Sequence, residues 1–147
     1  MNPEITSYLD SKGCYFRNRP WEVDEALTRL GVTPPREFVE FFRKYEGGFG
    51  SRHISFELAD IVGHAEELTQ TCRDVHGFPN QCVVLSDEVA DAVLVYDTLK
   101  DEMYDVDFEG SDEKLREGTL EPDWPSFSAF LEFYFLGQGR MSARNIS

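Results

Sequence analysis

Alternating carboxylates in the second half of the chain are the residues whose spacing most resembles a chemical site. An EF-hand loop surrounds calcium with alternate oxygens and needs glycine for a sharp turn, and it begins much like residues 105–110, DVDFEG. The twelfth position of such a loop must supply a bidentate carboxylate, but here it is Arg116. The eighth position, which is normally apolar, is Asp112. We therefore expect no calcium site, and a strand with one acidic face explains the alternation.

The histidines and cysteines do not fall at the spacings that metal sites use. His64 and Glu66 imitate the first half of the zinc deaminase signature, but the Pro-Cys-x-x-Cys half is missing. The cysteines are an odd number and match neither a disulfide framework nor a metal knuckle, so we expect reduced thiols packed in the core. No metal ligand is predicted among His53, His64, His76, Cys14, Cys72 and Cys82.

Sequence motifs for nucleophilic catalysis and for nucleotide binding are also missing. No G-x-S-x-G elbow, P-loop or dinucleotide-binding fingerprint occurs in the chain. Paired carboxylates can hydrolyse glycosides, but among 28 acidic residues a plausible pair is always found. A catalytic triad assembled only in space stays open. We expect a protein that is not an enzyme and that needs no cofactor.

The charge of the chain is negative and unevenly distributed. The 28 acidic and 14 basic residues give a net charge of −14, which repels phosphate backbones and anionic lipids, so nucleic acid and membrane are not expected partners. Residues 87–123 hold fourteen acids against three bases, which is −11 of that total. Such a concentration indicates a directed electrostatic surface, and a merely solvated face is the alternative.

The elements that must position these acids follow from apolar periodicity. At 147 residues we expect one α+β domain, 1–147, with a mostly antiparallel sheet of about four or more strands. Helices are predicted over the first ten residues and at 22–30, 35–45, 61–75 and 126–136. Strands are predicted at 53–58, 82–86, 91–97 and 102–109, the second and third of them pairing as a hairpin. A loop is expected over 110–123, and a polar tail over 137–147.

Finer expectations concern helix starts and location. Asp60 is a candidate N-cap for the helix over 61–75, and Asp123 or Ser126 for the last helix. The chain begins with neither a basic nor an apolar stretch typical of a signal peptide, and no segment has the roughly 18 apolar residues of a membrane span, so a soluble, cytoplasmic protein is expected.

Acids at one end of the predicted hairpin are the candidate binding residues. Side chains alternate along the predicted strand 102–109, which places three of its acids about 7 Å apart on one face. The loop between the two preceding strands adds three more. The predicted partner-binding residues are Asp87, Glu88, Asp91, Asp105, Asp107 and Glu109.

A string of structural residues in the first half resembles the N-terminal signature of the SUKH superfamily, the Smi/Knr-like domains. In that family a helix ending in Leu-Gly precedes a proline-started helix, a tyrosine and a Gly-Gly turn. The matching residues are Leu30-Gly31, Pro34-Pro35, Phe38, Phe41-Phe42, Tyr45 and Gly47-Gly48. The later order of strands and a final aromatic helix also fits, so the resemblance covers about residues 20–136, the expected core.

This resemblance implies an α+β domain that works by binding another protein. Many bacterial members are immunity proteins that neutralise a toxin, and fungal relatives are regulatory interaction modules. The acidic composition favours an immunity protein for a cognate basic toxin domain, because a nuclease has a basic cleft that an acidic protein can occupy. A regulatory or scaffold interaction module, or a small-ligand binder, is the alternative.

Overall fold

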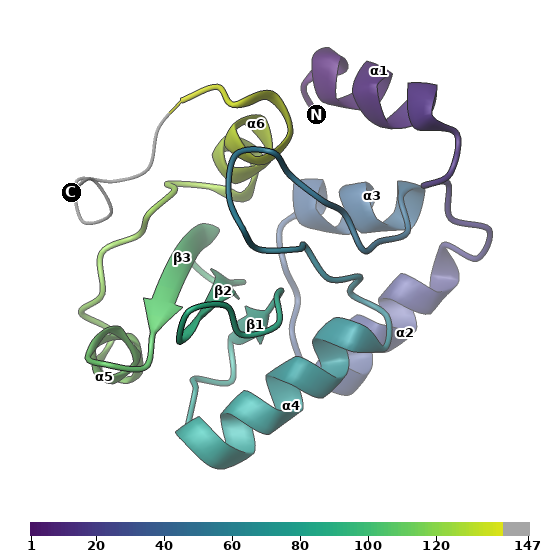
Figure 1. Ribbon diagram of the computed structural model, residues 1–147. Helices are drawn as coiled ribbons and strands as arrows, with labels where there is room; N and C mark the ends of the chain where they lie inside the picture. Colours follow the sequence, from purple (N-terminus) through teal and green to yellow (C-terminus); the bar gives the residue numbers. More distant parts are fainter. Residues whose placement is uncertain (140–147) are drawn as a thin grey trace.

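The computed structural model describes residues 1–139 as an α+β domain in which helices surround a small sheet (Figure 1). The helices are α1 (Pro3–Lys12), α2 (Trp21–Leu30), α3 (Arg36–Lys44), α4 (His64–His76), α5 (Ser111–Glu117) and α6 (Phe127–Leu136). The strands are β1 (Cys82–Val84), β2 (Ala92–Asp97) and β3 (Glu102–Asp107). No helix in this part of the chain has the length and apolar character needed to cross a bilayer. The predicted polar tail lies, from residue 140 onward, outside the described residues.

The sheet is antiparallel in the order β1-β2-β3, and the predicted hairpin of β1 with β2 is confirmed. The described residues form three strands, fewer than the four or more that were predicted. The strand expected over 53–58 is reduced to a single bridge between Leu58 and Phe49. The Tyr134 hydroxyl accepts from the Leu58 N–H and lies within hydrogen-bond distance of the carbonyls of Phe49 and Phe56, so α6 holds this segment in place.

Both faces of β1 and β2 are buried, as their continuous apolar runs predicted. One face packs into the main core with α1, α2, α3 and α6, through Val83, Leu85, Leu94, Tyr96 and Met103. The other face packs against α4 and α5 in a second core, through Cys82, Val84, Val93, Val95, Tyr104 and Val106. The sheet is therefore the middle layer between two sets of helices (Figure 1).

Aromatic rings fill the main core. Phe42 of α3 and Phe130 of α6 are completely buried, as the apolar stripes of these helices predicted. Ile5 and Leu9 of α1 are buried in the same core, because α1 packs on α6. The packed core therefore starts before residue 20, where the resemblance begins.

Side chains and loops cover the outer edges of the sheet. Along β3, the Met103 N–H donates to the Trp124 carbonyl, and the Asp105 N–H donates to the Asp123 carboxylate at 2.6 Å. Along β1, the Val84 N–H donates to the Thr69 hydroxyl of α4 at 2.8 Å. Both outer strands thus have backbone groups that are already occupied.

Where some helices begin depends on contacts between residues that are far apart in the sequence. α2, α3 and α6 begin and end within one residue of their predicted ranges, and Ser126 caps α6 by accepting from the Ala129 N–H. α4 begins at His64 rather than at 61, because Asp60 forms a buried ion pair with Arg17 instead of capping the helix. Asp123 does not cap α6 either, since it binds the edge of β3. α5 lies in the segment that was predicted to be a loop.

Candidate functional site

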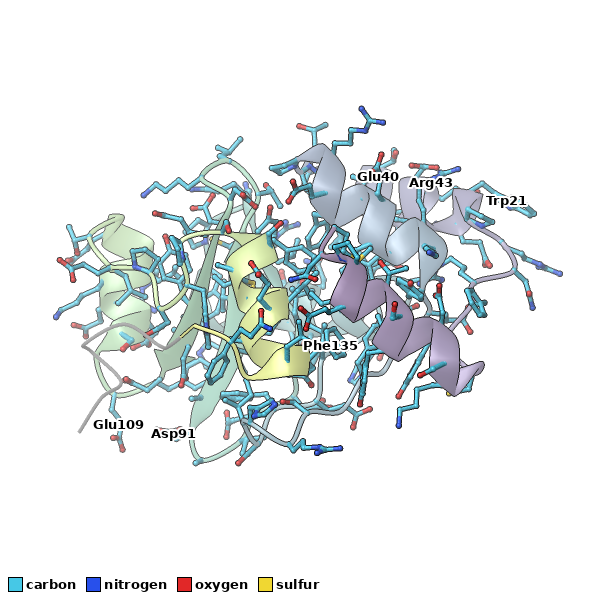
Figure 2. All side chains as sticks on the ribbon, turned by 90° about the horizontal axis from the view of Figure 1, so that it is seen from above. Trp21, Glu40, Arg43, Asp91, Glu109 and Phe135 are labelled. Atoms are coloured by element: carbon cyan, nitrogen blue, oxygen red, sulfur yellow. The ribbon has the colours of Figure 1, made fainter. Side chains whose placement is uncertain are left out.

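The predicted acidic residues lie around the end of the sheet where the β1–β2 loop, residues 85–91, meets the end of β3. The register pairs Ala92 with Asp107, and the Phe108 N–H donates to the Asp91 carbonyl at 3.0 Å. Asp91 at the end of the β1–β2 loop and Glu109 after β3, both exposed, are thereby brought near each other (Figure 2). Trp21 and Arg43 lie at the far end of the molecule in the same view.

The tip of this loop is a tight turn in an uncommon backbone conformation. Val89 pairs with Ala92 across two residues, Ala90 and Asp91, whose φ angles are 51° and 64°. Positive φ at both central positions is the geometry of a type I′ hairpin turn, which normally carries Asn-Gly. Neither Ala90 nor Asp91 is glycine, so both residues adopt a sterically unfavourable backbone conformation. The Asp91 carboxylate is attached to this strained turn.

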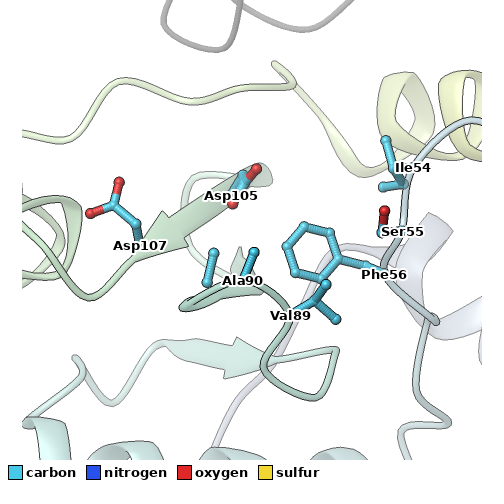
Figure 3. Close-up of a pocket in the computed structure, with 8 residues that line it drawn as sticks. Ile54, Ser55, Phe56, Val89, Ala90, Asp105 and Asp107 are labelled. Carbon is cyan, nitrogen blue, oxygen red and sulfur yellow. The ribbon is translucent and has the colours of Figure 1, made fainter.

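Asp105 and Asp107 of β3 line a hollow of about 460 Å³ beside this turn, which we call the tip hollow. Its other walls are apolar and come from two loops, chiefly through Ile54, Phe56 and Val89 (Figure 3). The two acids extend the sheet face that carries the main core, because Asp105 pairs with Leu94 of β2. The tip hollow is thus lined by two carboxylates and by several apolar side chains.

Asp107 has a structural role as well as a charge. Its carboxylate accepts hydrogen bonds from the N–H groups of Glu109 and Ser111 and from the Ser111 hydroxyl, at 2.7–3.2 Å. These bonds form the turn into α5, so β3 ends at Asp107 and not at Glu109 as predicted. Glu109 is therefore not the third member of a row along the strand.

Asp87 and Glu88 face the other side of the loop. The Asp87 carboxylate contacts the His64 imidazole at the start of α4, with an N···O distance of 3.1 Å. Glu88 lines a separate groove together with Glu67 of α4 and Phe108. Three of the six predicted acids therefore lie in the β1–β2 loop and face different sides of it, while the other three lie beside the loop at the end of β3.

Metal ligands and reactive thiols were sought among the described residues. Among residues 1–139, no three His, Cys, Asp or Glu side chains are grouped so that they could hold a metal ion. Burial raises the pKa of Cys72 to about 11 and that of Cys82 to about 12, so both thiols are protonated at neutral pH. Cys14 is exposed, and the expectation that it lies in the core was wrong.

A second polar hollow, of about 390 Å³, surrounds the buried Arg17 guanidinium. Arg17 donates to the Phe42 and Tyr45 carbonyls and pairs with Asp60, whose carboxylate also accepts from the Gly47 N–H. Because its donors are already bonded to the protein, this arginine holds the loops together rather than awaiting a ligand.

Comparison with protein-family models and with curated proteins yields no match. The resemblance to the SUKH superfamily stays a prediction. Sequence reasoning identified the acids but not the apolar walls beside them, because Ile54 and Phe56 lie in a segment that was predicted to be a strand and Val89 is a lone apolar residue in an acidic loop.

Proposed function

We propose that this chain is a non-catalytic binding domain that neutralises a basic partner protein, as an immunity protein does for its cognate toxin domain. The observation that carries the proposal is the meeting of Asp91 and Glu109 at the hairpin tip, next to the tip hollow with Asp105 and Asp107. The six predicted acids lie in the β1–β2 loop or beside it at the end of β3. A concave basic surface could therefore contact several of them at once.

Electrostatics support a basic partner. Residues 87–123 carry a net charge of −11, and the candidate site is built from this segment. Concentrated charge of one sign steers an oppositely charged protein and raises its association rate. A nuclease toxin fits this description, because its cleft is built to hold phosphate.

The backbone of the turn also supports a binding role. Non-glycine residues with positive φ cost about 1 kcal/mol or more, and such conformations cluster at functional sites. Ala90 and Asp91 both adopt one, although Asn-Gly would relieve it. Asp91 places an exposed carboxylate in this turn.

Affinity capture followed by kinetics tests the proposal. Cells that encode the chain would be lysed at low salt, and proteins bound to the tagged chain would be identified by mass spectrometry and purified. We expect a basic protein that arrests growth when expressed alone and not when co-expressed with this chain. The Asp91→Asn/Glu109→Lys variant should associate about tenfold more slowly at 50 mM NaCl, and less so at 300 mM.

A matched control makes the same change of charge on α2. Glu22→Gln/Glu25→Lys also alters the net charge by three, but at residues far along the chain from the hairpin. This variant should bind at close to the wild-type rate. Equal rates for wild type and the Asp91/Glu109 variant would place the binding surface elsewhere. A captured partner that is not toxic would favour the regulatory module instead.

A further inference from the structure

A groove on the opposite side of the β1–β2 loop is separate from the tip hollow. Its volume is about 290 Å³, and its floor belongs to the second core: Leu68 and Cys72 of α4, with Val84 and Val93 of the sheet. We call it the α4 groove. Its lining comes from α4, from the strands and loop of the β1–β2 hairpin, and from Phe108 just after β3. Figure 1 shows how α4 runs beside the sheet.

The end wall of the α4 groove is aromatic. Phe108 and His76 have ring centroids 4.4 Å apart, and Phe78 stacks on Phe108 at 6.1 Å with an interplanar angle of 17°. Phe108 is only half-buried and forms part of the lining. An aromatic face beside an open groove is a place where a cation can be held.

Two carboxylates stand at the rim of this groove. Glu67 of α4 and Glu88 of the β1–β2 loop are exposed, and neither forms an ion pair within residues 1–139. The Glu88 charge is close enough to contribute to the raised pKa of Cys72, which stays a neutral thiol in the wall. The groove thus combines an apolar floor, an aromatic end and a doubly negative rim.

We propose that the α4 groove receives an arginine side chain of the basic partner, with its methylenes on Leu68, Val84 and Val93 and its guanidinium against Phe108, between Glu67 and Glu88. This inference rests on the proposed function. Arginine fits better than lysine, because its planar, weakly hydrated head stacks on aromatic rings and bonds carboxylates through several donors. Its aliphatic part matches the apolar floor.

The position of the groove implies how the partner is held. Val89 and Ala90 line the tip hollow, whereas Glu88 and Val93 line the α4 groove, so the loop is a ridge between two depressions. A partner that sits over the ridge can reach both sides. Asp91 and Glu109 then govern how fast the complex forms, and the α4 groove governs how long the complex lasts.

A peptide titration tests the groove without the natural partner. The probe is a Gly-Ser octapeptide with two adjacent arginines, added to the full chain while the methyl resonances of Leu68, Val84 and Val93 are followed by NMR. We expect saturable shifts of these resonances and weaker shifts for Ile54 and Val89 in the tip hollow. Replacing both arginines by citrulline, which is neutral, should weaken binding at least tenfold, and lysines should bind several-fold more weakly.

Two variants test whether the chemical-shift changes come from peptide bound in the α4 groove. Glu67→Gln/Glu88→Gln should weaken peptide binding about tenfold, whereas Glu22→Gln/Glu25→Gln on α2 removes the same charge and should leave it unchanged. Thr71→Trp, at an exposed position on the rim, should block the groove without disturbing the core. Shifts confined to the tip hollow, or shifts that survive Thr71→Trp, would overturn the proposal.

Binding kinetics with the purified partner distinguish an error in the groove proposal from an error in the proposed function. Thr71→Trp should shorten the lifetime of the complex at least fivefold while the association rate stays within twofold of wild type. A complex whose lifetime is unchanged by Thr71→Trp overturns the groove and leaves the proposed function standing. A chain that captures no basic partner, yet binds the arginine peptide in the groove, contradicts the proposed function alone.

Discussion

At the scale of single residues, Glu66 is an acid that is held by several hydrogen bonds. Its carboxylate accepts two hydrogen bonds from the Arg29 guanidinium, at 2.7 and 3.1 Å, and one from the Gly63 N–H at 2.8 Å. It therefore joins α2 to the start of α4. The Arg29 hydrogen bonds are the main cause that lowers the pKa of Glu66 below its ordinary value, although partial burial opposes this effect.

The lowered pKa of Glu66 predicts a pH-dependent contribution to stability. A carboxyl with a lower pKa in the folded state stabilises the protein above its unfolded-state pKa, and this stabilisation is lost as the pH falls through the folded-state pKa. Glu66→Gln should therefore lower the free energy of unfolding by about 0.5–1 kcal/mol at pH 7 and by much less at pH 3, in urea titrations. Glu67→Gln, one residue later and without an ion pair, is the control. A deficit that is equally large at pH 3 would mean that the charge of Glu66 is not what stabilises the fold.

At the scale of elements, some helices could be predicted from local sequence, whereas other elements depend on contacts between distant residues. The apolar stripes of α2, α3 and α6 are strong enough to define those helices, because each buries one continuous face. α5 could not be predicted in this way, since seven residues with only Leu115 buried carry no readable period. The strand expected near Phe56 is reduced to one bridge, and the Phe56 carbonyl instead contacts the Tyr134 hydroxyl, 78 positions away in the sequence.

The positive φ angles of the turn predict opposite effects for two substitutions of Ala90. Asn tolerates this conformation better than Ala, so Ala90→Asn should stabilise the fold by about 0.5 kcal/mol. Val is branched at Cβ and fits it worst, so Ala90→Val should destabilise the fold by about 1–2 kcal/mol. Thermal unfolding of both variants beside wild type gives the comparison. Equal stabilities would show that the turn has a different conformation in solution.

At the scale of the whole molecule, charge could be predicted from the sequence and shape could not. The concentration of acids in residues 87–123 was evident, and the hairpin register placed many of them at one end. The separation of Asp87 and Glu88 from Asp105 and Asp107, by a loop with a depression on each side, depends on how α4 and the loop around Phe56 pack. No pattern in the sequence encodes that packing.

The net charge of −14 predicts that salt stabilises the protein. Repulsion among like charges opposes the compact state, and ions screen it over about 10 Å at 0.1 M. Raising NaCl from 20 to 500 mM should increase the melting temperature by about 2–4 °C, as about 1 kcal/mol does in a domain of this size. The Asp91→Asn/Glu109→Lys variant, three charges less negative, should respond less. A melting temperature that falls with salt would mean that attractive ion pairs dominate instead.

The covered edges of the sheet limit how this protein can associate with anything. A strand with free N–H and C=O groups recruits further strands, which leads to fibres or to partners that extend the sheet. Here the N–H groups of Met103 and Asp105 on one edge, and of Val84 on the other, are already bonded to Trp124, Asp123 and Thr69. These amides should exchange slowly with deuterium, and concentrated solutions should resist amyloid formation. This arrangement favours recognition through side chains, so surface substitutions should change the partner without altering the fold.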